Sequence, residues 1–126
     1  MIDFPDARTA ARQIAAVSEQ TRLQILYKLA EGPRNVGELA EMLGVPIVNM
    51  SHHLGVLRQH GLVQDEKDGR RVVYKFHPDV FTPPNGDADS LGTISLGVCR
   101  LAMRRSDALT ADGAKVSRKP VRKKAD

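Results

Sequence analysis

Apolar residues recur every three or four positions through the first half of the chain, which is the spacing of helices that bury one face. The first helix is expected from about residue 5, and its apolar positions are Ala7, Ala10, Ala11, Ile14 and Ala15. Because alanine is small, another helix can approach this side closely. A second helix is expected from about residue 19, with Ser18 as its N-terminal cap and with Gly32 and Pro33 ending it.

The next two predicted helices are joined by a very short turn. Asn35 and Glu38 have the spacing of a capping pair that starts the third helix. Its apolar positions are Val36, Leu39, Ala40 and Leu43, and Gly44 ends it. The fourth helix is expected from about Ile47 to His60, so only two residues separate it from that glycine. Two helices joined in this way predict a helix-turn-helix.

After Gly61 the apolar spacing changes from helical to strand-like. Residues 62–67 and 71–77 have the composition of strands, and Asp68-Gly69 between them is a strong hairpin signal. Four helices followed by a hairpin predict a winged helix-turn-helix. The expected fold class is therefore mainly α with a small β-hairpin, within the α+β class.

The side of the fourth helix that faces away from the core carries the candidate chemistry. Its expected core positions are Ile47, Met50, Leu54 and Leu57. At about 100° per residue, His52 then points away from the core, together with Val48 and Asn49. Ser51 and His53 lie on the two flanks, with His53 nearer the core. A polar surface near the start of the second helix of a helix-turn-helix is where major-groove contacts are made.

Each of these outward residues suits a contact with DNA. Asn49 can bond to N6 and N7 of an adenine, and Val48 can contact a thymine methyl group. His52 can donate to a base acceptor or a phosphate, while Ser51 suits a phosphate oxygen. The alternative for Asn49 and His52 is an ordinary solvated surface. For His53 we favour a partly buried position with its hydrogen bonds satisfied.

Arginines at the tip of the predicted hairpin extend this surface. Arg70 and Arg71 follow Gly69, with Lys67 and Lys75 on the strands. Cations at a wing tip commonly reach phosphates or the minor groove, although an exposed turn is also a normal place for arginine. The candidate DNA-binding residues are Val48, Asn49, Ser51, His52, Arg70 and Arg71.

The two adjacent histidines do not predict a metal or catalytic site. Adjacent helical residues diverge by about 100°, and the positions four residues either side of His52 are both valine. A nucleophile or general base needs an orienting partner, and no carboxylate lies nearby on this surface. We therefore expect no catalytic residue, no metal ligand and no cofactor, and the protein is not expected to be an enzyme.

The charge of the chain is concentrated near its C-terminus. Six of the 19 Lys and Arg residues and one of the 15 Asp and Glu residues lie from Lys115 onward, which leaves 13 bases and 14 acids before it. DNA binding by the folded part must then come from local charge arrangement, and the tail is either a polyanion-binding arm or a solvated end.

No stretch is long and apolar enough to span a membrane, and the N-terminus lacks the apolar block of a signal peptide. The single cysteine, Cys99, excludes an intramolecular disulfide and fits the reducing cytoplasm. We therefore expect a cytoplasmic protein with no membrane partner.

Residues 80–103 differ from the winged helix before them. A loop-forming stretch leads to "LGTISLGVCRLAM" at residues 91–103, whose composition favours a single strand over a helix. Such a strand has Ile94, Leu96 and Val98 on one side and Cys99, Leu101 and Met103 on the other. Because water on either side would be unfavourable, we expect the first helix or a second copy to cover it in a homodimer. For Cys99 itself, a small buried residue is favoured over a redox sensor.

Three parts are therefore expected along the chain: residues 1–79 as the winged helix-turn-helix DNA-binding domain, 80–103 as a strand-like dimerisation segment, and 104–126 as a basic, disordered tail.

"TRLQIL" in the second helix, "SHHLGVLRQHGLV" in the fourth and "GRRVVY" in the hairpin together resemble the ArsR (arsenical-resistance repressor) family of winged-helix regulators. The resemblance covers roughly residues 8–78. It implies a homodimeric repressor that binds an inverted-repeat operator in double-stranded DNA and usually releases it when an effector binds. The family's DNA-reading positions fall on the six candidate residues given above.

The sensing half departs from the resembled family. Thiol-based sensors of the family carry Cys-x-Cys where this sequence has Asn35 and Gly37, and zinc sensors use histidines in a last helix, whereas no histidine follows Asp79. The sequence thus predicts no metal site and identifies no effector. Two other functions remain open: a winged-helix protein-interaction module and a non-specific nucleic-acid-binding protein.

Overall fold

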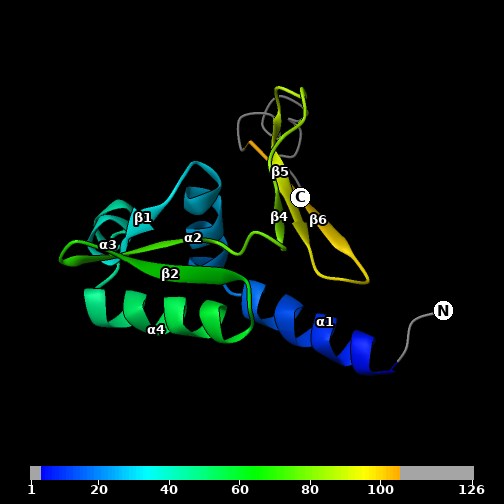
Figure 1. Cartoon of the computed structure of the whole chain (residues 1–126), viewed down its shortest axis with the longest axis horizontal. Helices are drawn as coiled ribbons and strands as arrows, with labels where there is room; N and C mark the ends of the chain where they lie inside the picture. Colours follow the sequence, from blue (N-terminus) through cyan, green and yellow to red (C-terminus); the bar gives the residue numbers. More distant parts are fainter. Residues whose placement is uncertain (1–3, 106–126) are drawn as a thin grey trace, which may run out of the picture.

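The computed structural model describes residues 4–105, which contain four helices and two small antiparallel sheets (Figure 1). The helices are α1 (Phe4–Val17), α2 (Gln20–Ala30), α3 (Val36–Leu43) and α4 (Ile47–Gln59). The first sheet has the order β1-β3-β2, with β1 (Arg34–Asn35), β2 (Val63–Asp68) and β3 (Arg71–Phe76). The second has the order β4-β5-β6, with β4 (Phe81–Thr82), β5 (Ser90–Ser95) and β6 (Arg100–Arg104). The predicted winged helix-turn-helix is confirmed.

The core of the winged helix is mainly aliphatic. Helices α2, α3 and α4 each contribute apolar side chains from one face, because their apolar residues recur at helical spacing. The fully buried side chains of this region are Ile25, Leu26, Leu39, Met50, Leu54, Leu57 and Leu62. These contacts hold α4 against the body of the protein along its inner side only.

The ends of the helices were predicted with mixed success. The Asn35–Glu38 capping box is present, with both of its hydrogen bonds 2.8 Å long. Gly44 ends α3 in the left-handed conformation, at φ 65°. Ser18 was wrongly predicted as the cap of α2: the helix begins one residue later, and the Glu19 carboxylate accepts the Arg22 backbone N–H at 2.9 Å.

The wing is the hairpin of β2 and β3. Asp68 pairs with Arg71, so Gly69 and Arg70 form a two-residue loop, with Gly69 at φ 67°. A third strand, β1, pairs with β3 and was not predicted. Two residues are too few to show the alternation by which a strand is recognised in a sequence.

The second sheet corrects the expectation of a single strand over residues 91–103. Gly97 and Val98 form a turn, closed by the Leu96 N–H donating to the Cys99 carbonyl oxygen at 2.8 Å. In the hairpin that results, Ile94 lies opposite Leu101. Because paired residues of antiparallel strands point to the same side, the two apolar sets share one face instead of taking opposite faces. Ile94, Leu96 and Met103 are buried, and Cys99 is partly buried.

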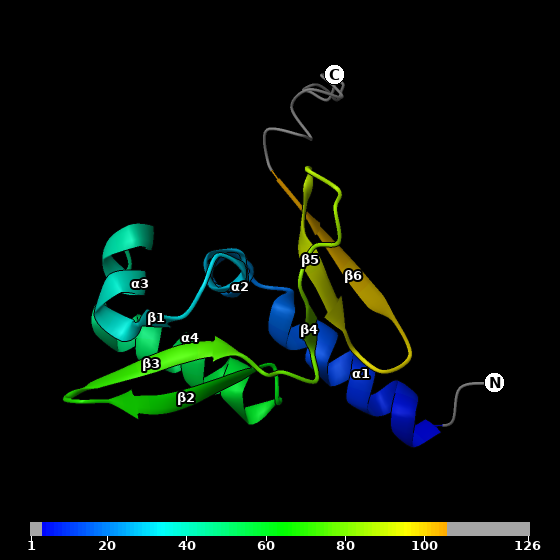
Figure 2. The same cartoon turned by 45° about the horizontal axis from the view of Figure 1, so that its top comes forward.

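The two sheets lie at different ends of the molecule. In both views, α3, α4 and the wing lie at one end, whereas the second sheet stands beside α1 at the other (Figures 1 and 2). Asp6, Thr9 and Gln13 of α1 line one hollow together with residues 95–98 of the second sheet. No helix within residues 4–105 is long and apolar enough to cross a membrane. The predicted basic tail lies outside the described residues, apart from Arg104 and Arg105.

Candidate nucleic-acid interface

The outer side of α4 presents the four predicted helix residues to solvent. Val48, Asn49, Ser51 and His52 are all exposed. On the opposite side, Met50, Leu54 and Leu57 are fully buried. The buried residues therefore fix the rotation of the helix about its axis, and this rotation turns the candidate residues outward.

Ile47 corrects the sequence analysis, which placed it in the core. Its side chain is 59% exposed. Ile47 is the first residue of α4, and the buried side of the helix begins one turn later, at Met50. Helical spacing gives the direction of a side chain but not the position along the helix at which packing begins. Ile47 is therefore an exposed apolar residue in the first turn of α4.

His53 lies on the flank of α4 and connects it to two other helices. Its Nδ1 atom is 3.2 Å from Nη1 of Arg22 and 3.7 Å from Oε1 of Glu19. Since an arginine can only donate, Nδ1 of His53 accepts, which places the proton of the neutral ring on Nε2. The Arg22 Nε atom also donates to the carbonyl oxygen of Ala16 near the end of α1. The partly buried, hydrogen-bonded position favoured from the sequence is found here.

Glu19 completes this cluster as a carboxylate. The Arg22 backbone N–H that it accepts lowers the pKa of Glu19 below the ordinary value of 4.5; burial partly opposes this shift, and the Arg22 side chain adds to it. His52 takes no part: its ring centroid is 5.6 Å from that of His53, with the planes inclined by 60°. The two histidines therefore face different surroundings.

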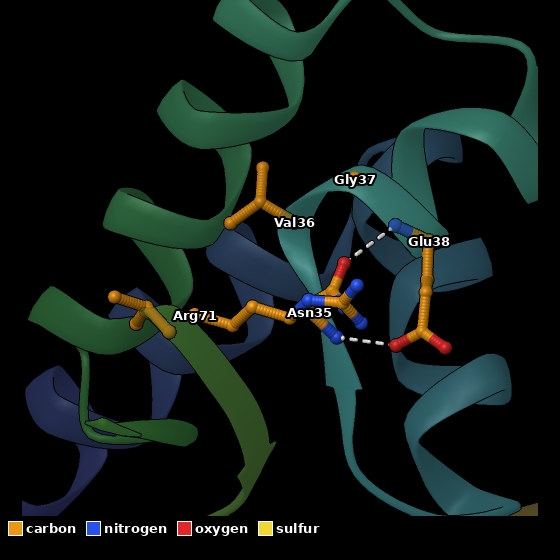
Figure 3. A pocket seen from close by; sticks show the side chains of 6 residues that line it. Asn35, Val36, Gly37, Glu38 and Arg71 are labelled. Carbon is orange, nitrogen blue, oxygen red and sulfur yellow. Dashed lines mark hydrogen bonds between the residues drawn. The ribbon is translucent and has the colours of Figure 1, made fainter. Parts of the chain in front are cut away.

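The two wing arginines take different positions. Arg70 is exposed in the loop at the tip of the hairpin. Arg71 is also exposed, but its side chain extends toward Asn35 and the N-terminus of α3, where the two hydrogen bonds of the capping box lie (Figure 3). Within residues 4–105 neither arginine forms an ion pair. Both positive charges are therefore available to an anionic partner.

Two other cations near the wing are already paired. Nζ of Lys75 lies 2.8 Å from a Glu66 carboxylate oxygen, and Nη1 of Arg58 lies 3.1 Å from an Asp65 oxygen. Lys75, considered from the sequence as a further wing cation, thus has a competing partner on the wing itself. Within residues 4–105, the wing cations without an ion pair are Lys67, Arg70 and Arg71.

The recognition helix α4 carries no acidic residue. No Asp or Glu occurs between Glu41 and Asp65, although the chain as a whole holds 15. The N-cap of α4 is Pro46, which forms no side-chain hydrogen bond to the helix. The N–H groups of the first turn therefore have no acceptor from a capping side chain. Free N–H groups and the positive end of the helix dipole favour a nearby anion such as a phosphate.

The positions that correspond to a thiol pair in the resembled sensors have other roles here. Asn35 accepts the Glu38 backbone N–H and caps α3, and Gly37 has no side chain. Among residues 4–105 there is no group of three or more His, Cys, Asp or Glu side chains placed to hold a metal ion.

Comparison with known proteins agrees with this geometry. Residues 19–65 match the family model described as bacterial regulatory protein, arsR family. The chain is 38% identical over 89 residues to the HTH-type transcriptional regulator Rv2034 of Mycobacterium tuberculosis, covering 71% of this chain and 83% of that protein. It is 38% identical over 76 residues to the regulator NmtR of the same organism, covering 60% of this chain and 63% of NmtR. Further matched proteins are named as transcriptional repressors.

A solved structure has the same fold. It is the homodimeric winged helix-turn-helix DNA-binding domain of a possible ArsR-family transcriptional regulator from Mycobacterium bovis, with a TM-score of 0.56 and 32% identity over 63% of this chain and 75% of that one. The chain spans 63% and 45% of the length of two of the curated relatives that it matches. The chain belongs to the arsR family of bacterial regulatory proteins.

Proposed function

We propose that the protein is a sequence-specific DNA-binding repressor that acts as a homodimer on an inverted-repeat operator. The observation that carries this proposal is the exposed, acid-free outer side of α4, the second helix of a helix-turn-helix. The wing adds two exposed arginines that form no ion pair within residues 4–105. A helix in this position enters the major groove, while the wing reaches the neighbouring backbone or minor groove.

Two residues of α4 are proposed to read base edges. Asn49 offers an amide that matches N6 and N7 of adenine, and His52 offers a ring N–H to a base acceptor. Ser51, on the flank, is proposed to bind a phosphate oxygen, which positions the helix without reading sequence. The direct contacts of Asn49 and His52 thus supply specificity, and those of Ser51 supply orientation.

The wing is proposed to supply affinity that does not depend on sequence. Arg70 at the tip can reach the minor groove or a phosphate. Arg71, which extends toward the start of α3, is placed for a phosphate between the wing and the helix-turn-helix. The two arginines would then contact the backbone at different points.

The homodimer is proposed to form through α1. Its small-residue side remains exposed in the single chain at Ala7, Ala11, Ile14 and Ala15, with Ile14 40% exposed. In the second sheet, Ile94, Leu96 and Met103 are buried within the chain, whereas Val98 at the turn is 38% exposed and leaves apolar surface for a partner. Of residues 80–103, which were expected as a whole to form the dimer contact, we therefore propose that only the turn at Val98, beside α1, contributes to it.

Contacts between α1 and α4 link the dimer to the recognition helix. Nε2 of Gln13 in α1 donates to the His60 carbonyl oxygen at the end of α4, at 3.1 Å. The Arg22 side chain, which contacts Ala16 in α1 and His53 in α4, joins the same two helices nearer the middle of α4. A dimer that reads a palindrome holds two recognition helices about 34 Å apart, one turn of DNA, and these links fix each helix relative to the dimer contact.

The proposal is tested by the affinity of the full chain for its own upstream DNA and for a scrambled duplex, at two salt concentrations. A repressor should prefer its operator by about a thousandfold or more. Equal, salt-sensitive binding to both duplexes would indicate a non-specific nucleic-acid-binding protein instead. Binding to neither would indicate an interaction module. A chromosomal operator also implies the cytoplasm as the place of action, and a role in binding rather than in catalysis.

A further inference from the structure

The two most exposed large apolar side chains in the described part of the chain are neighbours on the first turn of α4. Val48 is 79% exposed and Ile47 is 59% exposed, whereas the other exposed large apolar residues lie between 38% and 43%. Exposed apolar residues scattered singly are normal, but two adjacent ones at a functional surface indicate a contact.

Packing within the chain does not account for this pair. The inner side of α4 is already filled by Met50, Leu54 and Leu57, all fully buried. Ile47 and Val48 precede this buried row and form the start of the helix. The pair therefore adds apolar surface to water without adding to the core.

The pair has a defined place relative to the polar residues of the same helix. Ser51 lies one turn beyond both residues, and His52 lies one turn beyond Val48. The helix rises about 1.5 Å per residue, so the apolar first turn and the polar second turn meet different base pairs when the helix lies in a groove. The two turns can then recognise different chemical groups.

Only one group on the base edges of the major groove is apolar, the C5 methyl of thymine; the other groups are hydrogen-bond donors and acceptors. A valine and an isoleucine cannot pair with donors or acceptors, and they leave those groups without partners when they cover them. We propose that Ile47 and Val48 read thymine methyl groups in each half-site of the operator. This inference rests on the proposed function. It adds Ile47 to the residues that contact DNA, and it names A·T as the base pair that the first turn of α4 recognises.

The absence of acids from α4 favours DNA as the occupant over an apolar protein surface. No Asp or Glu lies between Glu41 and Asp65, and the exposed arginines of the wing are at the same end of the molecule. A partner with a negative charge and apolar groups on its surface fits both features, and thymine-containing duplex DNA has this combination.

The test begins with duplexes enriched by the full chain from a random DNA pool. In the tightest duplex, each thymine is replaced in turn by deoxyuridine, which keeps O4 and removes only the methyl group. We expect loss of about fourfold in affinity at one or two positions in each half-site, as for one buried methylene-sized group. Val48→Ala and Ile47→Ala should each abolish the effect at one of these positions.

A matched control separates this contact from general effects. Leu23→Ala removes an exposed apolar side chain of α2, 43% exposed, and should keep the full sensitivity to deoxyuridine. Specific binding that no deoxyuridine substitution weakens would overturn the inference and leave the proposed function standing. Unchanged sensitivity in both Val48→Ala and Ile47→Ala would also overturn it. Failure of any duplex to be enriched would overturn the proposed function together with the inference.

Discussion

The two ends of the molecule present different surfaces. The end with α4 and the wing presents polar side chains and arginines that have no ion pair in residues 4–105. At the other end, α1 presents small apolar side chains together with the exposed Arg8 and Arg12. Arg104 of the second sheet is paired with Asp87 and Asp89 at 3.7 and 3.5 Å. The first surface suits a polyanion, and the second suits another copy of the same chain. In the proposed function, DNA reading and dimer formation use separate ends of the molecule.

The largest expected effect comes from breaking the surface of α1. Ala11→Glu places a charge in the exposed small-residue side of α1, where a dimer contact would have to bury it. We expect monomers in sedimentation and a loss of operator affinity of about a thousandfold, to the level of non-specific binding. Gln24→Glu adds the same charge at an exposed position of α2 and serves as the control. A dimer that persists with normal affinity would remove α1 from the dimer contact.

A glycine substitution tests the second sheet. At Gly92, φ is 122° and an added Cβ would lie 2.5 Å from the Phe81 ring and 2.7 Å from the Thr82 carbonyl oxygen. Gly92→Ala should therefore destabilise the protein by about 3 kcal/mol, measured by denaturant unfolding. Gly55→Ala, where α4 leaves open space, should instead stabilise it by about 0.5–1 kcal/mol. Similar stabilities for the two variants would contradict the packing of Phe81 on Gly92.

The outer side of α4 is tested through base discrimination. Asn49→Ala and His52→Ala should each weaken operator binding by about 1–3 kcal/mol and leave binding to scrambled DNA nearly unchanged. Competition binding with the two duplexes measures both quantities. Equal losses on both duplexes would mean that these residues contact phosphates at most.

The wing should have the opposite effect. Replacing Arg70 and Arg71 with alanine should lower affinity for all duplexes, and the slope of log affinity against log salt should fall by about one unit for each lost phosphate contact. Arg12→Ala, at an exposed position of α1, provides the control for a lost positive charge. An unchanged slope would show that the wing arginines do not contact DNA phosphates.

The smallest expected effect concerns Glu19, which links α2 to the recognition helix. Its pKa is below 4.5 in the folded chain, mainly because the carboxylate accepts the Arg22 backbone N–H. A depressed pKa adds stability above the unfolded value, and this stability is lost as the pH falls through the folded value. Glu19→Gln should reduce the fall in stability between about pH 5 and pH 3. Parallel pH profiles for the two proteins would show that the carboxylate has no such role.

The sequence by itself determined the local elements of the winged helix. The capping pair of Asn35 and Glu38, the stop at Gly44 and the hairpin turn at Gly69 were all predicted, and all are present. Each depends on residues within four positions of one another, so backbone geometry and side-chain hydrogen bonds specify it without the rest of the chain. The outward direction of His52 followed in the same way from helical spacing.

Only the tertiary structure decided what lies next to these elements. Ile47 was expected in the core because it shares the helical spacing of Met50 and Leu54. Its side chain is instead 59% exposed, since the buried row of α4 begins only at Met50. The contacts of His53 with Arg22 and Glu19 join residues more than 30 positions apart, and β1 exists only through its pairing with β3. The turn at Gly97 placed two apolar sets on one face of a hairpin. These features depend on contacts between segments that are distant in the chain, and local spacing carries no information about such contacts.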